Sequence, residues 1–135
     1  MKTFNTARAL AGALAGLAPG AASTHAHAAI SDYAFQLVDK SVTVGPDTII
    51  SVRLVDTRTG KPVPDAVIIA MRLDMAPDGM ADMASTVAPI PGSAPGVYRF
   101  KAKVSMAGGW RLSLAAKVQG EDGTVDQKLV FKADE

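Results

Sequence analysis

The sequence predicts an all-β protein, and three observations carry that prediction. Apolar and polar residues alternate one by one in several short runs, which is the pattern of a half-buried strand. Clusters of Gly, Pro, Asp and Thr separate these runs at close spacing, as turns do. After the first 28 residues, no stretch shows the apolar period of a convincing helix.

The clearest alternation lies in the second half of the chain. The run from Gly96 to Val104 has an apolar residue at every even position from Tyr98 onward and a basic residue at each odd position from Arg99 to Lys103. Every even position from Trp110 to Val118 is apolar as well. The candidate strands are residues 34–40, 48–55, 66–74, 85–88, 96–104, 110–118 and 125–131. About seven short strands joined by turns favour an immunoglobulin-like antiparallel β-sandwich.

Inner faces of two earlier strands follow from the same period of two. They contain Ile50, Val52 and Leu54 in one strand, and Val67, Ile69, Met71 and Leu73 in the other. The segment from Asp56 to Pro62 is a turn by composition, and residues 85–88 form a short edge strand because prolines follow directly.

Residues 1–28 have the composition of a secretory signal peptide. Lys2 and Arg8 give a basic start, Ala9 to Ala22 is an apolar run, and Ala26-His27-Ala28 fits the small-x-small cleavage pattern. The run is too short and too glycine-broken to span a membrane. We therefore expect cleavage after Ala28 and a working domain of residues 29–135.

Two other cleavage sites would retain a histidine. Cleavage after Ala26 would make His27 the N-terminus, and cleavage after Ala22 would put His25 third; both arrangements suit Cu(II). Cleavage after Ala28 removes both histidines, and the chain has no cysteine. The expected domain thus has no disulfide and no lipoprotein anchor, and depends on its hydrophobic core alone.

Charge and composition exclude several function classes. Residues 29–135 carry 12 basic and 13 acidic side chains, which gives neither a basic face for nucleic acid nor a polybasic membrane patch. Without His or Cys, the domain lacks Ser-His and Cys-His nucleophiles and the usual zinc ligands. We expect a protein that is not an enzyme, binds no nucleic acid and has no stable membrane insertion.

Methionines carry the most informative pattern of the domain. Met75, Met80 and Met83 lie at and after the end of one strand, and Met106 lies in the loop before Trp110. Thioethers are soft, uncharged ligands that favour Cu(I). We expect these four methionines to form a surface metal site, with Trp110 as a cation–π neighbour. The alternative is that they fill gaps in the core and that Trp110 is the core tryptophan.

Three aspartates accompany the methionines at every fourth position, namely Asp74, Asp78 and Asp82. They lack the alternation and the terminal glutamate of an EF-hand loop. We expect them to be solvated carboxylates around a loop.

Three sequence motifs resemble the YtkA-like, or FixH-like, domain family of bacteria. They are Leu73-Asp74-Met75-Ala76-Pro77-Asp78-Gly79-Met80, Pro95-Gly96-Val97-Tyr98-Arg99-Phe100 and Met106-Ala107-Gly108-Gly109-Trp110-Arg111-Leu112. The resemblance covers about residues 41–132. It implies a periplasmic immunoglobulin-like sandwich and, through the methionine segment, the branch of the family associated with heavy-metal efflux.

The resemblance also implies a site and partners. Met75, Met80, Met83 and Met106 fall on the family's methionines, and Trp110 falls on its tryptophan. FixH proteins proper resemble membrane-anchored chains tied to oxidase copper supply, whereas this chain is expected to lose its apolar segment. We therefore expect a Cu(I)-binding, or Ag(I)-binding, accessory protein of a heavy-metal efflux adaptor or another copper-handling protein. The alternative is a metal-free interaction module that docks through an edge strand on an efflux adaptor or a cytochrome oxidase assembly partner.

Overall fold

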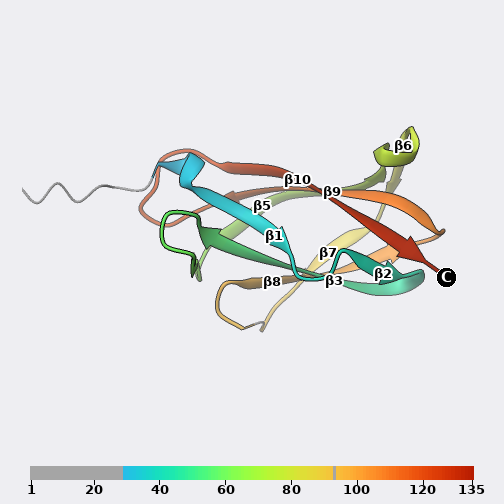
Figure 1. Ribbon diagram of the computed structural model, residues 1–135, viewed down its shortest axis with the longest axis horizontal. Helices are drawn as coiled ribbons and strands as arrows, with labels where there is room; N and C mark the ends of the chain where they lie inside the picture. Colours follow the sequence, from blue (N-terminus) through green and yellow to red (C-terminus); the bar gives the residue numbers. More distant parts are fainter. Residues whose placement is uncertain (1–28, 93) are drawn as a thin grey trace, which may run out of the picture.

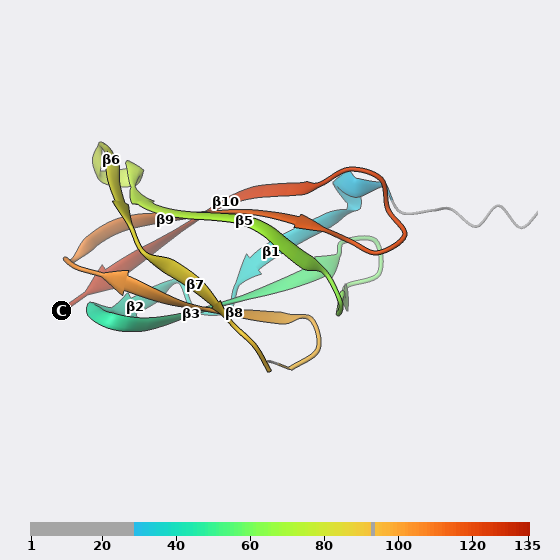
Figure 2. The same ribbon diagram turned by 180° about the vertical axis from the view of Figure 1, so that it is seen from behind.

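The computed structural model describes residues 29–92 and 94–135, and these form two β-sheets packed face to face (Figures 1 and 2). The predicted signal peptide, with His25, His27 and the expected cleavage site, lies outside the described residues. Within the described ranges, no helix has the length and hydropathy to cross a bilayer. The prediction of an all-β sandwich is confirmed.

The sandwich consists of a sheet A and a sheet B. Sheet A contains, in spatial order, β1 (Tyr33–Leu37), β3 (Gly45–Asp56), β8 (Val97–Val104) and β7 (Val87–Ile90), and the short β4 (Lys61–Pro62) pairs with the end of β3. Sheet B contains β2 (Ser41–Thr43), β10 (Val125–Asp134), β9 (Gly108–Lys117), β5 (Val67–Met75) and β6 (Met80–Ser85). Two single-turn 3-10 helices complete the described chain: η1 (Ile30–Asp32) precedes β1, and η2 (Ala76–Asp78) joins β5 to β6.

Strand order follows that of immunoglobulin domains. The path β1-β3-β8-β7 has the A-B-E-D order of one immunoglobulin sheet, and β10-β9-β5 has the G-F-C order of the other. Strand pairs are antiparallel except for β2 and β10, which run parallel. The described residues form ten strands instead of about seven, because the short β2, β4 and β6 lie where the sequence predicts no strand.

The core lies between the sheets and is built from the alternating faces. The predicted inner faces of β3, β8 and β9 are confirmed, since each of their apolar residues except the half-buried Tyr98 is buried. Trp110, with 1% of its surface exposed, is the largest fully buried side chain among the described residues. The core contains Phe35, Ile50, Val52, Leu54, Leu73, Met75, Phe100, Ala102, Val104, Trp110, Leu112, Leu114, Ala116, Val118, Val125, Leu129, Phe131 and Ala133.

The predicted inner face of β5 is wrong in its first half. Val67 and Ile69 are 56% and 50% exposed, because the register with β9 shifts between Ile68 and Ala70. A bulge adds one residue to a strand and therefore reverses the face of every residue before it. Ile68 consequently packs against the core, whereas Leu73 keeps its predicted inward position.

The Pro95-Gly96-Val97-Tyr98 motif fastens β8 to the turn before β5. The Tyr98 hydroxyl donates to the carbonyl of Val63 (2.7 Å) and accepts from the N–H of Ala66 (3.0 Å). Burial, opposed in part by that N–H, raises the pKa of Tyr98 above its usual 10.0. The motif therefore has a structural role, because its polar atoms are used inside the fold.

Gln127 joins the first and last long strands across the two sheets. Its amide oxygen accepts from the N–H of Phe35 (2.7 Å), and its amide nitrogen donates to the carbonyl of Phe35 (2.8 Å). This pair of bonds reproduces one rung of an antiparallel ladder. On the same flank, the Tyr33 hydroxyl donates to Glu121 (3.1 Å). Side chains thus close the sandwich on its β1 side.

Candidate functional site

The methionine segment folds as a tight hairpin from β5 through η2 to β6. Pro77 lies in the first turn of η2, where its fixed φ suits a helical turn and its missing N–H costs nothing. Gly79 follows with φ = +77°, and its N–H donates to the carbonyl of Ala76 (2.9 Å). Glycine adopts this left-handed conformation without a steric penalty. The sequence Ala76-Pro77-Asp78-Gly79 therefore sets the turn that leads into β6.

Gly108 and Gly109 of β9 lie directly against this turn. The N–H of Gly109 donates to the Asp78 carboxylate (3.1 Å). A Cβ atom on Gly108 would lie 2.3 Å from Asp78 Oδ2 and 3.0 Å from Met75 Cε, so a side chain would not fit without a shift. The two methionine-bearing motifs are thus in direct contact, although 31 positions separate Asp78 from Gly109 in the sequence.

The four predicted methionine ligands lie at one end of the sandwich in three different environments. Met83 in β6 and Met106 in the β8–β9 loop are 39% and 40% exposed. Met80, the partner of Met75 across the hairpin, is partly buried against the core. Met75 itself is 0% exposed, which corrects the expectation that all four thioethers lie at the surface. Its side chain belongs to the hydrophobic core, and its Cε lies close to Gly108.

Trp110 lies beneath this end and belongs to the core. Its indole N–H donates to the backbone carbonyl of Met106 (3.0 Å), which fixes the β8–β9 loop above the ring. Trp110 is also one of the residues that line a surface pocket of about 410 Å³ between β6 and β8. The pocket is lined by Met83, Ala84, Ser85, Thr86, Lys103, Ser105 and Trp110. Met83 and Trp110 therefore share a pocket, whereas Met75, Met80 and Met106 are not among its lining residues.

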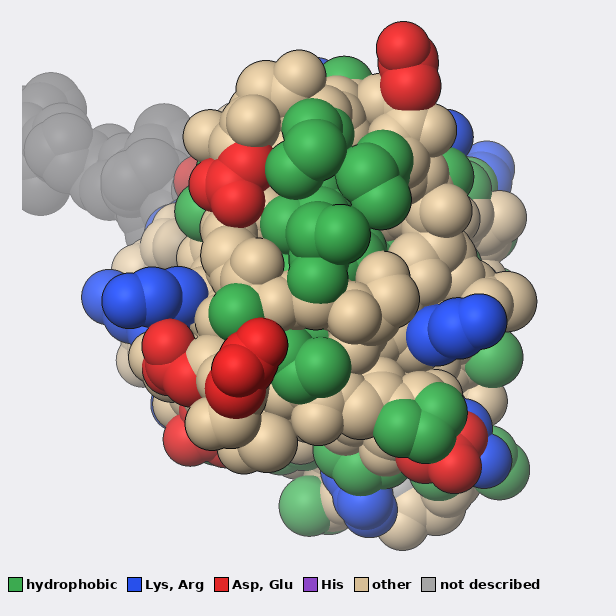
Figure 3. Space-filling model, turned by 90° about the vertical axis from the view of Figure 1, so that its right-hand side faces the viewer, with side chains coloured by type: hydrophobic (Ala, Val, Ile, Leu, Met, Phe, Trp, Pro, Cys, Tyr) green, Lys and Arg blue, Asp and Glu red, His purple; other side chains and the backbone are tan. Residues whose placement is uncertain are grey.

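Hydrophobic side chains gather at this end of the molecule. Figure 3 faces the end at which β6 and the C-terminus lie in Figure 1, and it shows a group of apolar side chains over the upper part of that face. Acidic and basic side chains are spread around its rim. An apolar patch with a polar rim is the usual appearance of a binding surface.

A charged cluster that the sequence analysis missed supports the hairpin. Asp74 is fully buried on the outer face of sheet B, where Arg72 Nε and Arg111 Nη2 each lie 3.0 Å from its Oδ2. Its Oδ1 accepts from the N–H of Ala76 (3.0 Å). Arg72 also donates to the carbonyl of Ala81 in β6 (2.8 Å). The cluster thus ties both strands of the hairpin to β9.

The electrostatics of Asp74 match this geometry. Burial alone would raise the pKa of its carboxyl, but hydrogen bonds from Arg111, the Ala76 N–H and Arg72 outweigh burial and hold the pKa below the usual 3.8. Asp74 is therefore an ion-paired structural carboxylate, which corrects the expectation of a solvated one. One signal was available in the sequence: Arg72 and Asp74 lie two apart on a strand and so share a face.

Hard-cation chemistry has no support in the described residues. The Asp78 carboxylate already accepts a hydrogen bond from the Gly109 N–H. No group of three His, Cys, Asp or Glu side chains within the described ranges could hold a metal ion. Methionine sulfur is thus the donor type that this end of the described chain offers to a soft cation.

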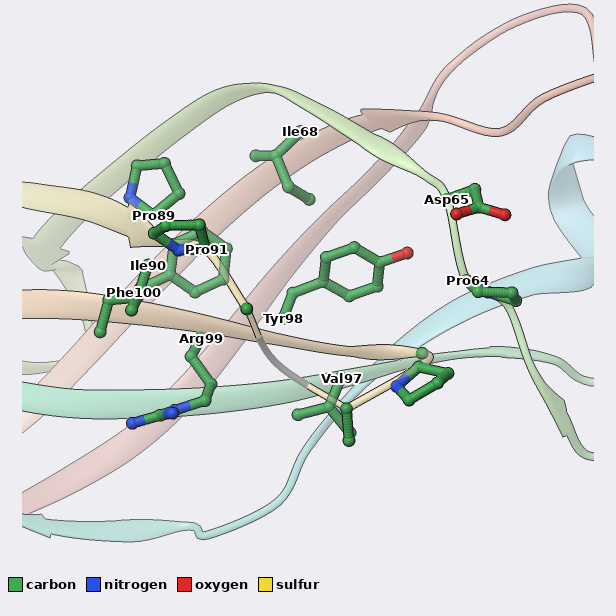
Figure 4. A pocket seen from close by; sticks show the side chains of 14 residues that line it. Pro64, Asp65, Ile68, Pro89, Ile90, Pro91, Val97, Tyr98, Arg99 and Phe100 are labelled. Atoms are coloured by element: carbon green, nitrogen blue, oxygen red, sulfur yellow. The ribbon is translucent and has the colours of Figure 1, made fainter.

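A second pocket, of about 360 Å³, lies at the other end of β8 (Figure 4). Its walls include Pro89, Pro91, Ile68 and the ring of Tyr98, whose hydroxyl points toward Pro64 and Asp65 (Figure 4). Because that hydroxyl is already bonded to Val63 and Ala66, the pocket presents mainly apolar surface.

Comparison with protein families identifies the chain. A family model described as YtkA-like matches residues 27–115, which span the strands from β1 to most of β9 and all three motifs. The chain belongs to the YtkA-like family. This match confirms the family that the sequence motifs indicated. The fold of this chain is the β-sandwich described above.

Other comparisons add little to this assignment. The YtkA-like chain is similar to a solved structure, the ZirS C-terminal domain, with 9% sequence identity and a TM-score of 0.45. That similarity covers 99% of this chain and 88% of the other. No curated protein matches the chain.

Proposed function

We propose that this YtkA-like protein is an exported, non-catalytic accessory domain that binds Cu(I), or Ag(I). The metal would bind at the end of the sandwich that contains Met80, Met83 and Met106, which we call the methionine end. The protein would serve the periplasmic adaptor of a heavy-metal efflux pump or another copper-handling protein. The observation that carries the proposal is the gathering of Met83 and Met106, which are 39% and 40% exposed, with the half-buried Met80 at one end of the sandwich.

The chemistry of thioethers supports this reading. A thioether has no proton to lose, so its affinity for a soft cation changes little with pH, in contrast to a His or Cys site. Neutral thioether ligands also release a metal readily to a partner by ligand exchange. The pocket beside Met83 is open to solvent and has Trp110 among its lining residues, so a cation bound there would lie near the tryptophan.

Met75 has a different role in the proposed site. Its side chain is buried in the core with its Cε close to Gly108, so we assign it to the support of the hairpin. The proposed ligands are therefore Met80, Met83 and Met106, with Met75 reaching a metal only if the hairpin opens.

An anaerobic Cu(I) titration tests the proposal. We expect the Met83→Leu, Met106→Leu double variant to lose affinity for Cu(I) by at least about tenfold, because even an outer-shell change at a metal site costs about 10- to 100-fold. Leucine is a near-isostere, so stability should change by less than about 1.5 kcal/mol. Met71→Leu is the matched control, since Met71 packs against the core within β5 and should leave Cu(I) affinity unchanged.

The outcome also separates the proposal from its rival. Unchanged affinity in the double variant would place the site elsewhere, and absence of Cu(I) binding by the wild type would end the metal hypothesis. The remaining function would be a metal-free interaction module. One observation favours that rival: β6 is an edge strand of sheet B, paired with β5 on one side only, and edge strands accept an added strand from a partner.

A further inference from the structure

The methionines of the described chain differ sharply in their access to solvent. Met83 and Met106 are 39% and 40% exposed, Met71 and Met80 are partly buried, and Met75 is completely buried. Oxidation of a thioether requires that the oxidant reach the sulfur. The fold therefore leaves some methionine side chains accessible to a dissolved oxidant and protects others.

Met83 differs from Met106 in its surroundings. It lines the pocket between β6 and β8, together with the hydroxyl-bearing Ser85, Thr86 and Ser105 and with Lys103. Ser85 already donates to the carbonyl of Lys103. A thioether accepts hydrogen bonds only weakly, whereas a sulfoxide oxygen is polar and accepts them well. Thr86, Ser105 and Lys103 are thus pocket residues that carry donor groups for an oxidised Met83.

We propose that Met83 and Met106 are sites of selective oxidation to methionine sulfoxide, and that oxidation of Met83 remodels the pocket above Trp110. The oxidant class is a peroxide. The sulfur lone pair attacks one peroxide oxygen, an S–O bond forms as the O–O bond breaks, and the second oxygen leaves as water after proton transfer. Sulfur loses two electrons and the peroxide gains them.

Trp110 reports which methionine has reacted. Trp110 lines the same pocket as Met83, whereas its indole N–H donates to the backbone carbonyl of Met106. Oxidation of Met83 places a polar oxygen in a pocket that Trp110 lines. Oxidation of the exposed Met106 side chain leaves the indole hydrogen bond in place. A change in tryptophan emission should therefore follow Met83.

The test is a time course with hydrogen peroxide on the metal-free protein. Sites are assigned by tandem mass spectrometry, because Met75, Met80 and Met83 fall on one tryptic peptide from Leu73 to Arg99. We expect Met83 and Met106 to be oxidised at least about tenfold faster than Met75, since Met75 reacts only when the hairpin opens. Oxidation of Met75 as fast as Met83 would overturn the selectivity.

Two single variants test the role of the pocket. The emission of Trp110 should change on oxidation of the wild type and of Met106→Leu, and stay unchanged in Met83→Leu. An emission change that persists in Met83→Leu and disappears in Met106→Leu would overturn the assignment to the pocket. Since no metal is present in either measurement, the result is independent of whether the methionine end binds Cu(I).

Discussion

Replacing Asp74 by alanine should lower the free energy of unfolding by about 3 kcal/mol. The carboxylate is fully buried and accepts from Arg72, Arg111 and the N–H of Ala76, so its removal leaves two guanidinium groups and one amide without their shared acceptor. Both arginines remain partly exposed to water, which keeps the loss at the lower end of the range for buried ion pairs. Urea denaturation measures it. Asp82→Ala is the matched control, because Asp82 is an exposed aspartate of β6 and its loss should cost less than about 0.5 kcal/mol.

The difference in unfolding free energy between the wild type and Asp74→Ala should depend on pH under acidic conditions. The pKa of Asp74 is lowered in the folded state, so its contribution is complete above the unfolded pKa of about 4 and is lost as pH falls through the lower folded pKa. We expect the difference between wild type and Asp74→Ala to be constant above about pH 5 and to shrink below about pH 4. A difference that stayed constant down to about pH 2 would show that the carboxylate charge does not contribute.

Gly96→Ala is expected to destabilise the fold by a similar amount, about 3 kcal/mol. Gly96 has φ = +79°, and a Cβ atom there would lie 2.4 Å from Pro62 Cβ and 3.2 Å from Pro62 Cα. A proline ring and backbone cannot rotate away as a flexible side chain can. The Gly96 carbonyl also accepts from the N–H of Leu54 (3.0 Å), which holds the turn before β8 against β3. Overpacking and the left-handed backbone therefore both contribute.

Gly60→Ala separates these two contributions. Gly60 has φ = +73°, but a Cβ atom there would meet no heavy atom within 4 Å, so only the backbone conformation opposes the substitution. Its expected cost is about 1 kcal/mol. Equal losses in the two variants, measured by thermal or urea unfolding, would mean that the contact with Pro62 is unimportant.

The sequence predicts the sandwich well where alternation is unbroken and fails where a local irregularity intervenes. The inner faces of β8 and β9 are correct because each strand alternates without interruption along its length. The face of Val67 and Ile69 is wrong because the bulge beside Ile69 reverses it, and a bulge without glycine leaves no mark in the composition. β6 is missed since Met80 to Ser85 contains few strand-forming residues and owes its conformation to pairing with β5.

The candidate site shows the same division. The sequence places Met75, Met80, Met83 and Met106 near one another, and they do lie at one end of the sandwich. Met75 is buried in the core beside Gly108, which is distant in sequence and is brought alongside by the β5–β9 pairing. Long-range contacts of this kind have no signature in a local pattern. The Asp74 cluster depends in the same way on Arg111 in the neighbouring strand.

The bridge between Gln127 and Phe35 has a consequence for how the chain reaches its native state. It spans 92 positions, and the pairing of β2 with β10 likewise joins the beginning of the domain to its end. Loops of that length must close before these contacts can form, which places such topologies among the slow folders, on a scale of milliseconds to seconds. The flank of β1 therefore stays open until β10 is available, and a chain that is still being synthesised cannot complete it.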